Sequence, residues 1–296
     1  MMWLFLAFGI AMMSMGADWM VGGCSRLSRA LHISAFVISA LVIGVGGNLP
    51  EILITLLSVG TDMESSILPI IVSSNIINIL GIVGIFAVVS PIYINTVSKR
   101  EVRILLMSTA LMAIMLYDGR LDFAEGIGLF AIFIYYLMGA KPRASRYDVI
   151  AMKDWWRTAA LLVFGIGFLY CGSEIFMNGL NQIVTRFHLD GSAAGSLIIA
   201  PGTSGPEIIV SILSIIRKRP AILIGNMVGS CVSHIILVGA IAGVIAEPTT
   251  ESFDVVLMLL ATIIFCIDIV ERKKITRWNG LLYLSLLCLY FLTIML

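Results

Sequence analysis

Two stretches of the chain, 156 residues apart, place the same helix-breaking and acidic residues inside long apolar runs. The first reads Gly44-Val45-Gly46-Gly47-Asn48-Leu49-Pro50-Glu51, and the second reads Ala200-Pro201-Gly202-Thr203-Ser204-Gly205-Pro206-Glu207. The apolar run around the first, residues 38–57, has about 20 residues, which at 1.5 Å per residue equals the hydrocarbon thickness of a bilayer. Glu51 and Glu207 are therefore expected near the middle of a membrane. A carboxylate at that depth is costly unless it faces a partner or a water-filled path, so both glutamates are candidate functional residues.

The composition agrees with a membrane protein of several spans. Hydrophobic residues make up 59% of the 296 and charged residues only 12%, whereas roughly a quarter of a soluble domain is charged. This excludes an ordinary soluble domain and leaves no nucleic-acid function. The expected partners are the lipid bilayer and inorganic cations, and nothing in the sequence indicates a cofactor or a protein partner. The five cysteines are scattered without metal-binding spacing and are interpreted as apolar packing residues.

Hydropathy predicts an all-α polytopic membrane protein with ten transmembrane helices. The expected helices cover residues 2–24, 34–59, 67–90, 101–117, 123–140, 157–178, 192–216, 221–246, 252–270 and 279–296. The loops after the odd-numbered helices hold 17 of the 19 Lys and Arg residues. By the positive-inside rule these loops are cytoplasmic and both termini lie outside.

The two motifs belong to an internal repeat. When each residue is aligned with the one 156 positions further along, the two halves correspond without a gap from residue 18 to residue 240. Five helices per half is an odd number, so the second half must enter the membrane from the opposite side. The expected organisation is a five-helix repeat at 1–140, a cytoplasmic linker at 141–156 and an inverted five-helix repeat at 157–296, with helices 2 and 7 broken. Inverted repeats with broken helices are typical of transporters that bind their cargo at the membrane midplane.

The broken helices offer oxygen ligands. Gly46 and Gly47 let the backbone leave helical geometry, which frees carbonyl oxygens that are tolerated at this depth only inside protein or along a cavity. Hydroxyl and amide groups accompany the two carboxylates on helices 2, 3, 7 and 8: Thr55, Ser58, Ser74, Asn78, Ser211, Ser214, Ser230 and, as an imidazole, His234. Such a set suits Ca²⁺ or Na⁺. The alternative for each hydroxyl alone is a hydrogen bond to a neighbouring helix.

The chain resembles the calcium/cation antiporter superfamily, and within it the prokaryotic sodium/calcium exchangers. The motifs that carry the resemblance are Gly16-Ala17-Asp18-Trp19-Met20-Val21, Gly47-Asn48-Leu49-Pro50-Glu51 with Ser74-Asn75-Ile76-Ile77-Asn78, and Gly202-Thr203-Ser204-Gly205-Pro206-Glu207 with Gly229-Ser230. The resemblance implies an integral protein of a prokaryotic plasma membrane, central Ca²⁺ binding by the two glutamates, flanking Na⁺ sites, and alternating access through sliding of helices 1 and 6. The cation ligands that it implies are Glu51, Glu207, Gly44, Gly47, Asn48, Ser74, Asn78, Ala200, Thr203, Ser204, Ser230 and His234.

Departures from the family pattern leave alternatives open. Gly47-Asn48 stands where the family usually has Thr-Ser, and His234 stands where an acidic residue is common. A cationic His234 would repel Na⁺, so the leading prediction of a Na⁺/Ca²⁺ antiporter has a proton-coupled divalent-cation antiporter as its alternative. Ser204 with His234 also admits a rhomboid-like intramembrane serine protease, although such an enzyme does not need a second copy with Glu51. The sequence therefore predicts a transporter rather than an enzyme.

Overall fold

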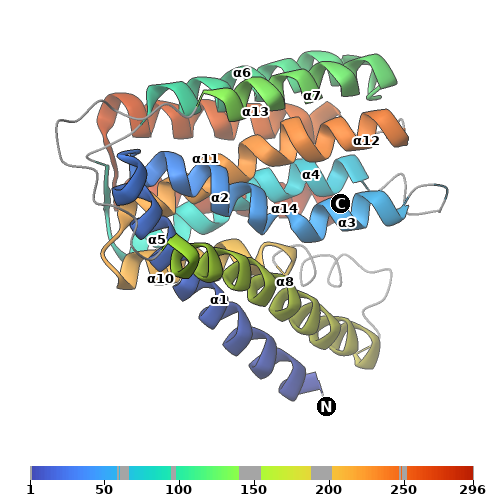
Figure 1. Cartoon of the computed structure of the whole chain (residues 1–296). Helices are drawn as coiled ribbons and strands as arrows, with labels where there is room; N and C mark the ends of the chain where they lie inside the picture. The colour runs from blue at the N-terminus through green and yellow to red at the C-terminus, as the bar shows by residue number, and fades with distance from the viewer. Residues whose placement is uncertain are drawn as a thin grey trace.

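The computed structural model describes residues 2–58, 60, 67–94, 98–139, 155–187, 202–246, 248 and 252–295. Ala200 and residues 141–154 of the expected linker lie outside this part of the chain. Within it, the structure consists of long apolar helices and one short two-stranded ribbon (Figure 1).

Helices cover both halves of the chain. The first half contains α1 (Met2–Leu31), α2 (Ala35–Gly47), α3 (Leu49–Ser58), α4 (Ile67–Ile76), the π-helix η2 (Ile77–Val83), α5 (Gly84–Val89), α6 (Lys99–Met115), the 3-10 helix η3 (Leu116–Asp118) and α7 (Phe123–Met138). The second contains α8 (Trp155–Arg186), α10 (Gly205–Ile216), α11 (Pro220–Ser233), the π-helix η4 (His234–Val238), α12 (Gly239–Ile245), α13 (Ser252–Ile267), the π-helix η5 (Asp268–Arg272) and α14 (Arg277–Met295).

The length and apolar composition of the helices indicate an all-α membrane protein. In the described part of the chain, six helical stretches are long and apolar enough to cross a bilayer: Met2–Leu31, Ala35–Leu57, Ile67–Val89, Trp155–Arg186, Pro220–Ile245 and Phe253–Arg272. Two shorter apolar helices, Phe123–Met138 and Gly205–Ile216, accompany them.

α1 and α8 are longer than the hydropathy pattern predicts. α1 ends at Leu31 rather than near residue 24, and α8 covers Trp155–Arg186 rather than 157–178. The predicted ends were wrong because polar residues such as Arg26 and Gln182 lower the mean hydropathy, yet they are compatible with a helix. A left-handed glycine or a proline commonly ends a helix, and neither occurs in these turns.

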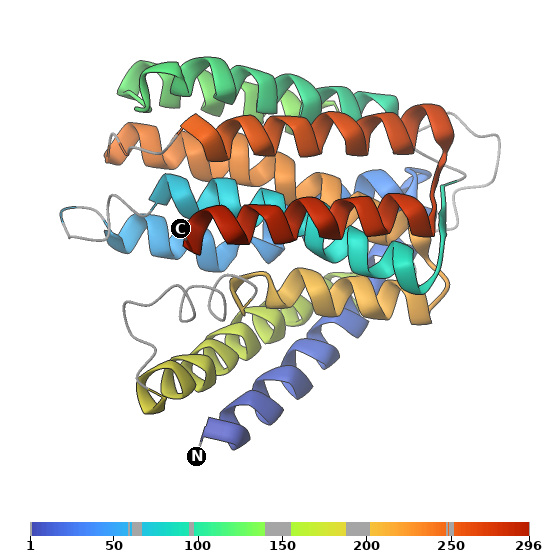
Figure 2. The same cartoon turned by 180° about the vertical axis from the view of Figure 1, so that it is seen from behind.

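α1 and α8 pack along each other through glycines. Both views show the two helices side by side and inclined to the rest of the molecule (Figures 1 and 2). A Cβ atom on Gly16 would lie 2.7 Å from the carbonyl oxygen of Gly165, and one on Gly9 would lie 2.8 Å from that of Gly172. The glycines recur every seven residues in each helix: Gly9, Gly16 and Gly23 in α1, and Gly165, Gly172 and Gly179 in α8. Such small residues let two helix backbones approach closely in a membrane.

The other helices form a stack beside this pair. Figures 1 and 2 place α6 and α7 at one end of the molecule and α1 with α8 at the other, with α2, α4 and α11 between them. α2 and α11 approach most closely at glycines, because a Cβ atom on Gly44 would lie 2.7 Å from the backbone nitrogen of Ser230. The central helices are therefore held backbone to backbone at the level of the first broken helix.

Contacts between loops tie distant parts of the chain together. The strand β1 (Ile92–Tyr93) pairs antiparallel with β2 (Lys274–Ile275), and the nitrogen of Leu121 donates a 3.2 Å hydrogen bond to the carbonyl of Pro248. The connections that follow α5 and η5 thus meet, and so do those that follow η3 and α12.

Candidate cation site

Two helix interruptions define the centre of the site. α2 ends at Gly47, Asn48 forms a turn, and α3 resumes at Leu49; in the second half Ser204 forms the turn before α10. Asn48 and Ser204 are 156 residues apart, so the two interruptions fall at equivalent positions. A proline in the first turn of each resumed helix suits this geometry, because its missing N–H would have no partner there.

One buried carboxylate from each half lies directly after each interruption. The side chains of Glu51 and Glu207 are 3% and 2% exposed and lie near enough to repel each other when ionised. A Cβ atom on Gly47 would lie 3.1 Å from Oε1 of Glu207, so glycine leaves room for the carboxylate of the second half against the broken helix of the first. The hydroxyl of Ser230 on α11 donates to the same Oε1 across 3.4 Å.

π-Helical turns position the side chains on the facing wall. Asn78 lies in η2 and His234 begins η4, and both side chains are buried. Nε2 of His234 is 3.9 Å from Oε1 of Glu51, and its Nδ1 is 3.3 Å from Oδ1 of Asn75. A π-turn inserts one extra residue into the helix and is frequent at functional sites.

Unpaired polar atoms, most of them oxygens, lie on the helices that carry the carboxylates and on the facing wall. Among the described residues, the following buried atoms have no hydrogen-bond partner near this site: Oε2 of Glu51 and of Glu207, Oδ1 of Asn48, both amide atoms of Asn78, Nε2 of His234, and the hydroxyls of Ser211 and Ser214. An unpaired buried polar group costs about 1–3 kcal/mol, so such a concentration needs a ligand to justify it. A dehydrated hard cation takes oxygen ligands of these kinds. No three His, Cys, Asp or Glu side chains converge in the described part of the chain, so amide, hydroxyl and carbonyl oxygens would supply most ligands.

Comparison with known proteins identifies the family. A family model described as sodium/calcium exchanger protein matches residues 1–140 and 157–296. The chain belongs to the sodium/calcium exchanger family. The antiporter is 26% identical over 287 residues to an uncharacterized membrane protein of Methanocaldococcus jannaschii, covering 95% of this chain and 94% of that protein. It is 23% identical over 332 residues to the sodium/calcium exchanger MaX1 of Methanosarcina acetivorans, covering 94% and 93% of the two chains.

A solved structure has the same fold. The sodium-calcium exchanger NCX_Mj, soaked with 10 mM Na⁺ and zero Ca²⁺, superposes with a TM-score of 0.87 at 25% sequence identity over 98% of both chains. The antiporter is accordingly a membrane transporter for cations and not an enzyme. The intramembrane protease considered from the sequence loses its basis.

The structure distributes the predicted ligands of the antiporter unevenly. Direct contacts connect five of them to the carboxylate pair: Glu51, Glu207, Gly47, Ser230 and His234. Two more, Gly44 and Asn48, are connected through hydrogen bonds with Ser233 and Ser230. The remaining residues lie on the elements that carry the site: Ser74 and Asn78 buried on the α4–η2 helix, Ser204 buried before α10, and Thr203 partly exposed beside it. Ala200 is outside the described residues.

Two buried residues of the site were missed from the sequence. Oδ1 of Asn75 faces Nδ1 of His234 as a hydrogen-bond acceptor, and the hydroxyl of Ser233 donates to the carbonyl of Gly44. Asn75 stands within the Ser74–Asn78 motif and could have been selected from it, whereas Ser233 has Ile77 as its repeat equivalent and gave no signal.

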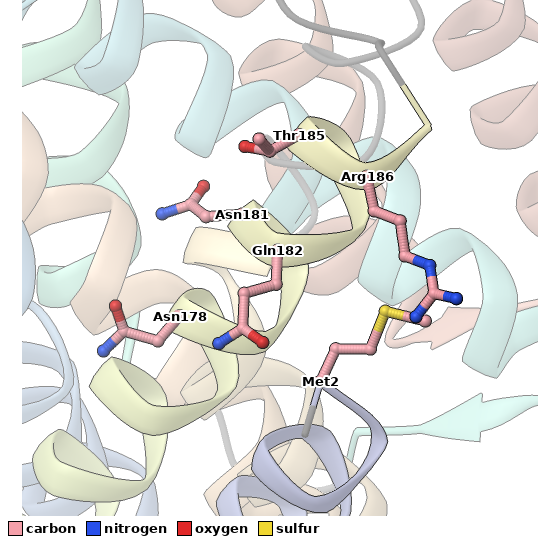
Figure 3. A pocket seen from close by; sticks show the side chains of 6 residues that line it. All are labelled: Met2, Asn178, Asn181, Gln182, Thr185 and Arg186. Atoms are coloured by element: carbon pink, nitrogen blue, oxygen red, sulfur yellow. The ribbon is translucent and has the colours of Figure 1, made fainter.

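A pocket of the antiporter lies away from the carboxylates. It has a volume of about 480 Å³ and is lined by Met2, Asn178, Asn181, Gln182, Thr185 and Arg186 (Figure 3). The four polar residues at 178, 181, 182 and 185 form one face of the last turns of α8. The only charged side chain in its lining is the guanidinium of Arg186, so this pocket does not suit a cation.

Proposed function

We propose that this antiporter exchanges Ca²⁺ for Na⁺, with the ions bound between Glu51 and Glu207. The observation that carries the proposal is the pair of buried carboxylates, one from each half, each with an unpaired Oε2 among the described residues. Two negative charges in a dry site are balanced by one Ca²⁺ or by two monovalent cations. The same pair can therefore hold either cargo in turn, and that competition couples the two fluxes. The relatives MaX1 and NCX_Mj are both described as sodium/calcium exchangers, which supports the choice of ions.

The proposed topology has ten crossings in two inverted repeats, 1–140 and 157–296, joined by a cytoplasmic linker at 141–156, with both termini outside. The pairing of β1 with β2 supports a common side for the loops that follow the third and ninth crossings. The hydrogen bond between Leu121 and Pro248 supports the opposite side for the loops after the fourth and eighth. The basic residues assign the first of these sides to the cytoplasm.

Alternating access is proposed to use the α1–α8 pair. The glycines let the backbones of α1 and α8 pack closely against each other, which favours movement of the two helices as a unit. The bond between the guanidinium of Arg217 and the carboxylate of Asp18, 2.5 Å long, joins α1 to the end of α10 in the present conformation.

The second candidate is a proton-coupled divalent-cation antiporter. His234 favours it, because its Nε2 lies 3.9 Å from Oε1 of Glu51, which places a side chain able to carry a proton beside the carboxylate. In this scheme protons on His234 and the glutamates replace Na⁺ as the counter-cargo.

Flux measurements in proteoliposomes distinguish the two candidates. Radioactive Ca²⁺ uptake is measured with an outward Na⁺ gradient at equal pH, and then with an outward proton gradient without Na⁺. We expect the Na⁺ gradient to drive uptake, and vesicles carrying Glu51→Gln to serve as the background. Uptake driven by the proton gradient alone would establish the second candidate, and uptake with neither gradient above background would refute both.

A further inference from the structure

A hydrogen-bond network closes one side of the carboxylate pair. Nδ2 of Asn48 donates to the carbonyl of Ser230 across 3.0 Å and to the hydroxyl of Ser233 across 2.5 Å. The hydroxyl of Ser233 donates to the carbonyl of Gly44 across 2.7 Å. Asn48, Ser230 and Ser233 are all 0% exposed. The backbone carbonyls of Gly44 and Ser230 thus both accept a side-chain donor, and that of Ser230 also accepts the backbone N–H of His234.

The orientation of the Asn48 amide is fixed by its partners. A backbone carbonyl can only accept, so the amide nitrogen and not the amide oxygen must face Ser230. The Ser233 hydroxyl gives its proton to Gly44 and is left as an acceptor, which again requires the nitrogen of Asn48. Oδ1 of Asn48 points away from these partners and is unpaired within the described part of the chain.

The other half of the molecule cannot build this network. The positions 156 residues away from Asn48, Ser230 and Ser233 are occupied by Ser204, Ser74 and Ile77. Ile77 has no hydroxyl to donate, and Ser204 replaces an amide that has two donor hydrogens with a single rotatable hydroxyl. The two sides of the carboxylate pair therefore differ chemically although the helices around them are equivalent.

We propose that Asn48 and Ser233 seal their side of the site against a coupling cation. A Na⁺ ion that approached the Gly44 and Ser230 carbonyls would meet N–H and O–H hydrogens, which repel it, instead of free oxygens. Monovalent binding is confined to the glutamates and the side of Ser74 and Ser204, so the protein binds one Na⁺ fewer than a symmetric pair of flanking sites would. The inference rests on the proposed function, since it concerns how many coupling ions that same site accepts.

The number of Na⁺ ions bound at saturation tests the proposal. Radioactive Na⁺ binding is measured on the purified full chain in detergent without Ca²⁺. Asn48→Asp replaces the donor amide with an isosteric carboxylate that can only accept, and Asn48→Leu with Ser233→Ala removes both donors without adding a charge. We expect each variant to bind one more Na⁺ per molecule than the wild type.

Ser39→Ala is the matched control, because the buried Ser39 hydroxyl bonds the carbonyl of Ile222 across 2.8 Å between the same two helices without taking part in the network described above. Its Na⁺ count should equal that of the wild type. The proposal is overturned if Asn48→Asp and the double variant elute as folded protein but bind no additional Na⁺. If the double variant fails to fold, Asn48→Asp decides alone. A wild type that binds no Na⁺ would refute the proposed coupling ion, while the gain or its absence in Asn48→Asp would still decide the sealing.

Discussion

Replacing one carboxylate by its amide should change ion preference as well as lower transport. Glu207→Gln keeps the shape of a side chain that is 2% exposed and removes one negative charge. With Ca²⁺ bound, the wild-type pair is neutral, and the variant keeps one uncompensated positive charge in a dry site. Removing one partner of a buried ion pair costs about 3–5 kcal/mol. At 1.4 kcal/mol per tenfold, Ca²⁺ affinity should fall by roughly 10²- to 4 × 10³-fold.

The loss for Na⁺ should be smaller, because one remaining carboxylate still neutralises one monovalent ion. Binding of radioactive Ca²⁺ and Na⁺ to the purified variant measures both affinities, and Glu51→Gln should give the same result. Glu101→Gln is the matched control: Glu101 is also 2% exposed, but it pairs with Arg100 at 3.2 Å on α6. The reasoning is refuted if Glu207→Gln keeps wild-type Ca²⁺ affinity, or if Glu101→Gln loses as much as Glu207→Gln.

Three further predictions concern packing, conformation and topology. Gly229→Ala places a Cβ atom 2.6 Å from a backbone carbon of α2, and this overpacking should lower stability by about 1–3 kcal/mol; an unchanged melting temperature in detergent would contradict it. Asp18 and Arg217 are 38% and 57% exposed, so their ion pair should contribute at most about 1 kcal/mol. Neutralising either should therefore change the exchange rate with little change in melting temperature, and exchanging the two residues should restore the rate; a rate that stays at the wild-type value in the single variants would exclude a conformational role. A single cysteine in place of Lys99, in a cysteine-free background, should react with a membrane-impermeant probe only from the cytoplasmic side, and labelling from outside intact cells would reverse the proposed orientation.

The sequence was sufficient to predict the two helix interruptions, because these have local causes. Glycines, a proline and a glutamate within eight residues predict a break at the membrane midplane, and the structure has turns at Asn48 and Ser204. The glycine repeat of α1 and α8 was also visible in the sequence as a spacing of seven residues. This spacing alone does not predict helix packing, because a glycine can occur in a helix for many reasons.

Tertiary contacts decided the features that the sequence did not predict. The π-turns that carry Asn78 and His234 depend on how those helices pack, and no local residue pattern specifies them. Ser233 reaches the carbonyl of Gly44 from 189 residues away along the chain. The repeat misled here, because its equivalent position is occupied by Ile77 and symmetry arguments draw attention to the positions that match.

The positions where the repeat fails to match bear on the choice of ion. The glutamates, Glu51 and Glu207, are identical in the two halves and fix the charge that must be balanced, which either one divalent or two monovalent cations can do. The neighbouring positions differ: Asn78 is paired by the repeat with His234, and Ile77 with Ser233. Neutral ligands cannot change the total charge of the site. They determine whether one divalent cation or two monovalent cations can be coordinated by enough oxygen atoms. Duplication thus accounts for the carboxylate pair, and under the proposed function divergence between the halves decides which cations the pair accepts.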